Sequence, residues 1–156
     1  GGAAKDFGAG VAGPAMRRFA MICAVWASLS APVLANPAAT QALNDLRASR
    51  GVAPVTYSAQ LEAAAKAHAL DMAKHRYFAH EGRNGSSVGD RVKKQRYKWC
   101  FVAENLAKGQ RDLGQVMQGW ATSPGHYANM VNRKAVSFGL FEGPDRIWAM
   151  VLAAPC

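Results

Sequence analysis

Apolar residues recur with helical spacing at two places in the first half of the chain. Residues 38–50 carry Leu43 and Leu46 on one face, which predicts a helix there. A longer helix is predicted from Ser58, a residue type that caps helix N-termini, to about His75. Its apolar stripe is rich in alanine, which lets a helix pack closely against its neighbours. The stripe consists of Leu61, Ala64, Ala65, His68 and Met72.

In the second half of the chain, shorter apolar runs alternate with turn-forming residues. A further helix is predicted from a capping Asp112 to Pro124, which cannot continue a helix. Gly and Pro at positions 142–145 predict a turn between two strands. The predicted extended segments are 55–57, 101–107, 136–140 and 147–152. Helices that precede and interrupt a small, mainly antiparallel sheet predict an α+β fold with helices on both sheet faces.

Residues 16–35 have the pattern of an export signal. Two arginines precede an apolar run, and the segment ends in Val-Leu-Ala, which predicts cleavage before Asn36. The alternative is a transmembrane anchor, and the run is too often interrupted for one. The interruptions are Ser28, Ser30 and Pro32. We therefore expect an exported, periplasmic or extracellular protein with one domain over 36–156 and no membrane span, preceded at 1–15 by an extension or a misplaced start.

Composition adds a charge and a cysteine count to this picture. The 156 residues are 50% hydrophobic, which excludes a wholly disordered chain, and carry 19 Lys+Arg against 10 Asp+Glu, for a net charge of +9. Of three cysteines, Cys23 lies in the predicted signal, which leaves Cys100 and Cys156. In an oxidising compartment an even pair predicts a disulfide, and two free thiols are the alternative. No histidine lies near either cysteine in sequence, so we do not expect a catalytic cysteine.

The four histidines divide into two kinds. His68 lies on the apolar stripe and His75 at a helix end, which predicts structural roles for both. His80 and His126 lie among small and turn-forming residues, where binding and catalytic side chains are often placed. Glu104 interrupts an apolar strand and needs a partner if it is buried. A His/Glu/His set can hold zinc with an open position, or it can form a purely structural polar network.

Four blocks of sequence, in this order along the chain, resemble the signature blocks of the CAP superfamily. This is the family of cysteine-rich secretory, antigen 5 and pathogenesis-related 1 proteins, here in its compact bacterial secreted form. The resemblance extends from about Gln41 to the C-terminus. The blocks are Phe78-Ala79-His80, Glu104-Asn105-Leu106-Ala107 with Ala103 before it, Trp120 to Met130 around Ser-Pro-Gly-His, and Phe138-Gly139.

The resemblance implies a three-layer α-β-α sandwich with a concave cleft lined by two histidines and two glutamates. His80, Glu104 and His126 match three of these four positions, and Ser123 stands where many relatives have the second glutamate. Loss of one carboxylate lowers the charge available to a divalent cation. Any zinc would then rest mainly on His80 and His126 and bind weakly, and no cofactor is required. Ser123 before Pro124 favours an ordinary helix end over a nucleophile.

A run of basic residues crosses the middle of the chain. Within eight residues it contains Arg91, Lys93, Lys94, Arg96 and Lys98, interleaved with Tyr97 and Trp99. The simplest interpretation is a solvated basic helix end. The alternative is a surface for anionic lipid head groups or envelope polymers. We do not expect nucleic acid, because it is not the usual polyanion outside the cytoplasm.

Three hypotheses for function follow, and the sequence leaves the oligomeric state open. The first is a secreted binding module whose cleft or basic surface takes a lipid-like or envelope ligand. The second is a weak metal-dependent hydrolase with His80 and His126 as ligands and Glu104 as general base. The third is a structural or interaction domain without cleft chemistry.

Overall fold

The computed structural model describes residues 36–156. The predicted export signal over 16–35 and the preceding residues 1–15 lie outside the described residues. The helices are α1 (Pro37–Ala48), α2 (Ala59–His75), α3 (Val88–Lys94), α4 (Leu113–Ala121) and α5 (Pro124–Met130). The strands are β1 (Thr56–Tyr57), β2 (Trp99–Lys108), β3 (Ser137–Gly143) and β4 (Ile147–Pro155). Among these described helices, none is long and apolar enough to cross a membrane.

The four strands form one sheet in the order β1-β3-β4-β2. β3 and β4 form the predicted hairpin, joined by a short 3-10 helix over Pro144–Arg146, and β4 pairs antiparallel with β2 along its whole length. Only the two-residue β1 runs parallel, beside β3. The mainly antiparallel sheet predicted from sequence is confirmed, and it leaves β2 as an edge strand.

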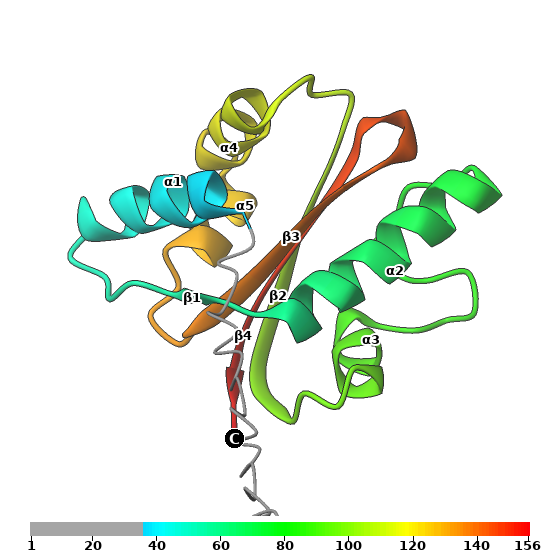
Figure 1. Cartoon of the computed structure of the whole chain (residues 1–156), viewed down its shortest axis with the longest axis horizontal. Coiled ribbons are helices and arrows are strands. Elements are labelled where there is room, and N and C mark those ends of the chain that lie inside the picture. The colour runs from blue at the N-terminus through cyan, green and yellow to red at the C-terminus, as the bar shows by residue number, and fades with distance from the viewer. Residues whose placement is uncertain (1–35) are drawn as a thin grey trace, which may run out of the picture. The chain divides into compact units, whose positions relative to one another are not determined.

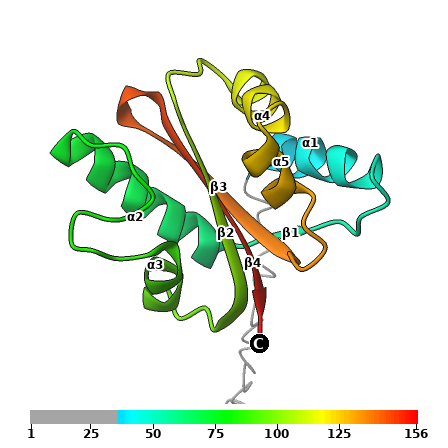
Figure 2. The same cartoon turned by 180° about the vertical axis from the view of Figure 1, so that it is seen from behind.

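Helices cover both faces of this sheet. α2 and α3 lie on one face and α1, α4 and α5 on the other (Figure 1), which Figure 2 shows from behind. β4 is buried on both faces, and its side chains alternate between them as a strand requires. Trp148, Met150 and Leu152 join the core under α1, α4 and α5, whereas Ile147, Ala149, Val151 and Ala153 join the core under α2 and α3. The expected α-β-α sandwich is confirmed.

The long helix α2 begins after the predicted cap. The Ser58 hydroxyl accepts the backbone N–H of Leu61 at 3.3 Å, and the helix ends at His75 with Arg76 in a left-handed conformation. Its alanine-rich stripe lies close to β3, because Gly139 there has no side chain between the strand and the helix backbone at Glu62. Sequence therefore predicted both the bounds and the packing face of this helix.

Two short helices were not predicted. α3 begins at Ser87, whose hydroxyl and backbone exchange hydrogen bonds with Asp90 in a capping box. α5 begins at Pro124, so this residue starts a new helix rather than ending α4, which already ends at Ala121 with Thr122 as its C-cap. Proline is favourable in the first turn of a helix because the N–H that it lacks has no partner there. Both helices are only seven residues long, too short for a periodic pattern to indicate them.

The side chain of Arg47 is fully buried in α1. Its guanidinium donates to four backbone carbonyls at 2.8 to 3.2 Å, those of Ala53, Met130, Asn132 and Ala135. Burial lowers the pKa of Arg47 from its usual value. One arginine thus ties α1 to the segment that follows α5, and nothing in the local sequence distinguished it from a solvated arginine.

The predicted disulfide joins Cys100 at the start of β2 to Cys156 after β4, with the Cα atoms 4.8 Å apart. Beside the disulfide, the backbone N–H of Cys156 donates a hydrogen bond to the carbonyl of Lys98. The disulfide therefore fixes the last residue of the chain to the edge strand that carries Glu104.

Candidate functional site

Glu104 is the centre of the predicted site. It lies on the edge strand β2, opposite Val151 of β4, so its side chain faces α2 and α3. Both carboxylate oxygens have partners: Nδ1–H of His80 donates to Oε1 at 2.9 Å, and Nη2 of Arg91 donates to Oε2 at 2.8 Å. Because a carboxylate only accepts, this bond assigns the proton of the His80 ring to Nδ1. The buried carboxylate that the sequence left unpartnered is thus fully satisfied.

Arg91 reaches Glu104 from α3 and is itself only 8% exposed. Its guanidinium also donates to the carbonyls of Ser86 and His80 at 2.8 and 2.9 Å. It therefore fastens the loop that carries His80 to the sheet. Sequence interpretation missed this role and placed Arg91 on a basic surface, which is wrong. The sequence signal that could have indicated this role was Glu104 in an apolar strand. A buried carboxylate needs a cationic partner, and a guanidinium suits buried ion pairs best.

The other members of the basic run remain on the surface. Lys93, Lys94, Arg96 and Lys98 are exposed. Trp99 beside them is 38% exposed, and its indole N–H donates to the carbonyl of Gly89 in α3. The basic surface proposed from sequence consequently contains four cations rather than five.

His126 and Ser123 approach the site from the opposite side of β2. Both belong to the start of α5, so the loop predicted around His126 is in fact a helix. Nδ1 of His126 and the Ser123 hydroxyl are 3.0 Å apart. Ser123 occupies the N-cap position but caps no backbone N–H, because its hydroxyl is turned to the histidine. Burial, and then repulsion from His80, lowers the pKa of His126.

Asparagine side chains hold α5 against the edge strand. Asn105 is fully buried, and its amide donates to the carbonyl of His126 at 3.0 Å. Asn129 donates to the side-chain oxygen of Asn105 at 2.9 Å and to the carbonyl of Glu104 at 3.4 Å. Trp120 of α4 donates to the carbonyl of Leu106 in the same strand. These contacts cover an edge that would otherwise expose unpaired carbonyls.

His80 and Glu104 lie on one side of β2, and Ser123 and His126 lie on the other. His80 is close enough to His126 to affect its pKa, and its side chain is 62% exposed. The four residues predicted for the cleft therefore come together around one edge strand. They combine two imidazoles and a hydroxyl with a carboxylate whose charge is already compensated by Arg91.

His68 has the structural role predicted for it. It is a buried residue of α2, and its Nε2–H donates to the carbonyl of Ala79 at 2.7 Å. The same Nε2 lies 4.0 Å from Oε1 of Glu104. Burial lowers the pKa of His68 more than the nearby Glu104 raises it. His75 lies at the end of α2, where its Nδ1 faces Nη1 of Arg83 at 2.7 Å. Neither histidine belongs to the cleft.

The residues present do not fit a resident zinc ion. Within 36–156, no group of three or more His, Cys, Asp or Glu side chains is placed to hold a metal. Zinc sites in proteins use three or four such ligands. Glu104 is paired with the guanidinium of Arg91, and that positive charge opposes a second cation beside the same carboxylate. Zinc chemistry at this site therefore stays a hypothesis from sequence.

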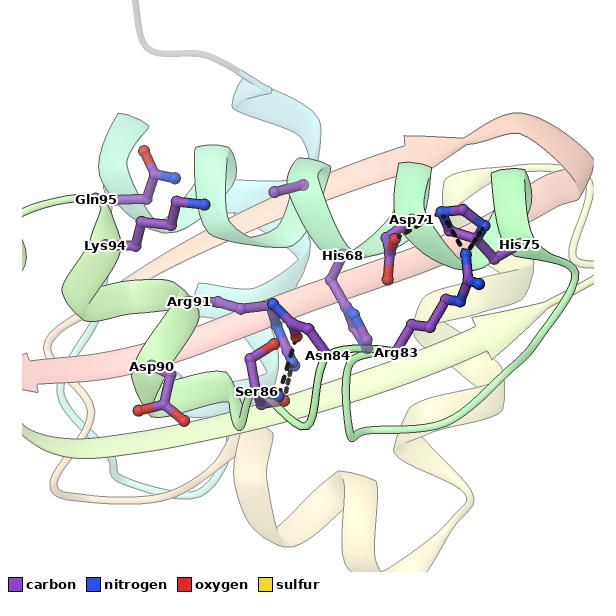
Figure 3. Close-up of a pocket in the computed structure, with 11 residues that line it drawn as sticks. His68, Asp71, His75, Arg83, Asn84, Ser86, Asp90, Arg91, Lys94 and Gln95 are labelled. Carbon is purple, nitrogen blue, oxygen red and sulfur yellow. Dashed lines mark hydrogen bonds and ion pairs between the residues drawn. The ribbon is translucent and has the colours of Figure 1, made fainter.

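A cavity of about 660 Å³ lies between α2 and α3 (Figure 3), beside the predicted cleft. We call it the α2/α3 pocket. Its lining residues are Ala67, His68, Asp71, His75, Arg83, Asn84, Ser86, Asp90, Arg91, Lys94 and Gln95. Apart from His68, His75 and members of the basic run, these residues carried no signal in the sequence.

A three-layer sandwich whose edge strand holds a buried Glu between two histidine-bearing segments defines the class of CAP-like domains. The model of the cysteine-rich secretory protein (CAP) family matches residues 40–141, and the chain belongs to this family. A curated relative, the uncharacterized protein YkwD of Bacillus subtilis (strain 168), is 30% identical over 106 residues. That match covers 67% of this chain and 41% of the relative, so the chain spans well under half of that protein.

Solved structures share the fold. An extracellular protein of Bacillus anthracis that contains an SCP domain aligns with a TM-score of 0.71 at 23% identity, over 74% of this chain and 39% of that one. An outer surface protein of Borrelia burgdorferi aligns with a TM-score of 0.69 at 21% identity, over 75% and 90% of the two chains. A cysteine-rich secretory protein of Staphylococcus aureus aligns with a TM-score of 0.62 at 18% identity, over 78% of this chain and 40% of that one.

Proposed function

We propose that this chain is an exported CAP-domain binding module whose cleft at His80, Glu104, Ser123 and His126 takes a lipid-like or cell-envelope ligand. The observation that supports a binding role is that both carboxylate oxygens of Glu104 already accept hydrogen bonds. Its two oxygens are held by His80 and Arg91, so the carboxylate positions the cleft and has no free role as a base. Export is supported by the signal pattern at 16–35 and by the similar structures, one of an extracellular protein and one of an outer surface protein.

The groups left for a ligand are two imidazole rings and a hydroxyl. Nδ1–H of His80 is committed to Glu104, which leaves Nε2 as the ring nitrogen available to a ligand on an exposed side chain. His126 and Ser123 form a second polar pair, and burial keeps His126 neutral. Phe78, two residues before His80, exposes 47% of its surface. Polar groups near an exposed aromatic ring suit an amphipathic molecule, whose polar end the imidazoles and hydroxyl contact and whose apolar part the ring contacts.

The metal-dependent hydrolase is the competing hypothesis. It requires Glu104 to accept a proton from water, and both oxygens of that carboxylate already accept hydrogen bonds, from His80 and from Arg91. The plain structural domain requires no ligand at all. Both hypotheses can be separated from the binding module by titration of the purified protein.

A fluorescent fatty acid and a fluorescent sterol are suitable probes for the cleft. We expect saturable binding of at least one, weakened about tenfold by His80→Ala and by His126→Ala, which corresponds to loss of roughly one good polar contact. His75→Ala is the matched control, because His75 lies outside the cleft, and should bind as the unmodified protein does. Equal binding by all variants, or none by any, would contradict the proposal.

Calorimetry with zinc at neutral pH tests the hydrolase directly. We expect no saturable heat with the unmodified protein. Zinc binding that disappears in His80→Ala and His126→Ala, together with metal-dependent cleavage of a peptide, would favour the hydrolase instead.

The exposed basic surface is a separate part of the proposal. Lys93, Lys98, Tyr97 and Trp99 line a second, smaller cavity of about 300 Å³ at this surface. Cations around an exposed indole suit anionic lipid head groups or envelope polymers. Retention on vesicles containing phosphatidylglycerol should fall steeply as salt is raised, and vesicles of phosphatidylcholine alone should retain nothing. Absence of retention at low salt would remove this surface from the proposed function.

A further inference from the structure

The α2/α3 pocket has the size and the walls of a small-molecule site. Its volume of about 660 Å³ falls within the range of roughly 300 to 1,000 Å³ common for ligand pockets. α2 forms one wall, α3 the other, and the loop between them crosses the opening with Arg83, Asn84 and Ser86 (Figure 3). All of these walls belong to described elements.

The pocket is separated from the His80/His126 cleft by the side chain of Arg91. Its terminal nitrogens donate to the carboxylate of Glu104 and to the carbonyls of Ser86 and His80. Its Nε is buried and has no hydrogen-bond partner within the described part of the chain. A buried donor without a partner costs about 1 to 3 kcal/mol, so an acceptor in this region would be favourable.

The two carboxylates of the pocket already have donors. Asp71 accepts the hydroxyl of Tyr77, and Asp90 accepts both the N–H and the hydroxyl of Ser87. These hydrogen bonds lower the pKa of both carboxyl groups, so both are ionised and engaged at neutral pH.

Two cations of the pocket, Lys94 and Arg83, have no carboxylate partner among the described residues. The side-chain ammonium of Lys94 makes no ion pair with any residue of 36–156. Arg83 directs Nη1 to the ring of His75 rather than to a carboxylate. The pocket therefore holds a surplus of donors, which favours an oxyanion.

A second orphaned atom points to a hydroxyl group beside that oxyanion. Nε2–H of His68 donates to the carbonyl of Ala79, so Nδ1 is an acceptor, and it is buried without a partner within 36–156. An unmatched acceptor and the unmatched donor Nε of Arg91 both belong to residues that line this pocket. A hydroxyl group or a water molecule can both donate and accept, so it is the kind of group that suits an unmatched donor and an unmatched acceptor.

We infer that the α2/α3 pocket is a second binding site, distinct from the His80/His126 cleft, for a small polyhydroxylated molecule that carries one phosphate or carboxylate group. Lys94 and Arg83 contact the oxyanion, and Asn84, Ser86 and Gln95 contact the hydroxyl groups. The pocket is far larger than an inorganic anion, which is why the sugar-like part of the ligand is required.

Calorimetric titration of the purified protein with glucose 6-phosphate, glucuronate, glucose and inorganic phosphate tests this inference. Glucose 6-phosphate or glucuronate should bind at least tenfold more tightly than glucose or inorganic phosphate. Binding of the phosphate ester alone identifies a phosphate ligand, and binding of glucuronate alone identifies a carboxylate ligand. Equal affinity for glucose, or no saturable binding of either anion up to roughly 10 mM, overturns the inference.

Three variants assign the binding to this pocket. Lys94→Gln and Arg83→Gln should each weaken binding by about tenfold, whereas Lys93→Gln, one residue away on the same helix and outside the pocket, should not. Ala67→Phe fills the pocket from the exposed side of α2 without changing charge, and should abolish binding. His126→Ala should leave it unchanged. Equal weakening by Lys93→Gln, or full binding by Ala67→Phe, overturns the inference.

Discussion

Arg91 and Glu104 form a buried ion pair between α3 and the edge strand β2. Nη2 lies 2.8 Å from Oε2, and the two side chains are 8% and 2% exposed. The pair connects two parts of the molecule: the proposed cleft, through the bond from His80 to Glu104, and the α2/α3 pocket, which Arg91 lines. The same side chain therefore positions the cleft histidine and separates the two sites.

Loss of one member of this pair should be strongly destabilising, because it leaves a buried charge without its partner. Arg91→Ala is expected to lower the free energy of unfolding by about 3 to 5 kcal/mol, measured by urea denaturation. Lys93→Ala, an exposed lysine on the same helix, should change it by less than about 0.5 kcal/mol. If Arg91→Ala and Lys93→Ala proved equally mild, the ion pair would not hold α3 in place.

The hydrogen bond from Tyr77 to Asp71 gives stability a defined pH dependence. It holds the pKa of Asp71 below its usual range, so the unfolded chain binds the proton first as pH falls. This stabilisation is complete above the ordinary carboxyl pKa of about 4 and is lost as pH falls through the lower value in the folded state. Tyr77→Phe should cost about 1 kcal/mol at pH 7, and the difference should shrink below about pH 4.

Tyr57→Phe is the matched control for that experiment. The hydroxyl of Tyr57 is buried without a hydrogen-bond partner in the described region, and its ring packs edge-on against Phe138 at 5.4 Å between centroids. Its removal should be neutral or slightly stabilising at every pH. Chemical denaturation over a pH series measures both variants. A constant difference between Tyr77→Phe and the unmodified protein would exclude Asp71 as its source.

Gly139 is required by the close approach of β3 to α2. A Cβ there would overlap the backbone of Leu61 and Glu62 and lie 2.7 Å from the Cα of Glu62. Gly139→Ala should therefore destabilise the fold by about 3 kcal/mol or more, because backbone must move. Gly125→Ala in α5 meets nothing within 4 Å and should be neutral or stabilising by up to about 1 kcal/mol. Thermal unfolding of the two variants separates them, and similar midpoints would contradict the close packing.

The disulfide between Cys100 and Cys156 closes a loop with a sequence separation of 56 residues. On the chain-entropy account, its loss should cost about 4 kcal/mol. The double variant Cys100→Ser, Cys156→Ser should unfold at a correspondingly lower temperature, and a reductant should lower the midpoint of the unmodified protein but not that of the variant. An unchanged midpoint in both would show that the antiparallel pairing of β2 and β4 alone holds the C-terminus.

Much of the fold could be predicted because its signals are local. Ser58 caps α2 and Asp112 caps α4 through side-chain hydrogen bonds that need only three residues of sequence. The turn at 142–145 joins two apolar runs that pair as neighbours. α3 and α5 escaped prediction because seven residues complete only about two helical turns.

The sequence proposed the members of the cleft but did not indicate the ion pair beside them. His80, Glu104, Ser123 and His126 came from the resemblance of sequence blocks, and the structure brings them together around β2. The neutralisation of Glu104 by Arg91 did not follow from those blocks, because the two residues lie on different elements. A basic run predicts exposure for all of its members, yet Arg91 is buried and Lys93 is exposed on the same short helix.

The sequence by itself determined the periodic elements, their caps, the pairing of the two remaining cysteines and the family of the domain. These depend on side chains that act on their own backbone or on blocks of adjacent residues. Only the tertiary structure decided the burial of Arg47 and Arg91, the pairing of Arg91 with Glu104 and the existence of the α2/α3 pocket. Each of these depends on which side chains from distant segments meet, and the free energy of a buried charge is set by those partners rather than by its sequence neighbours.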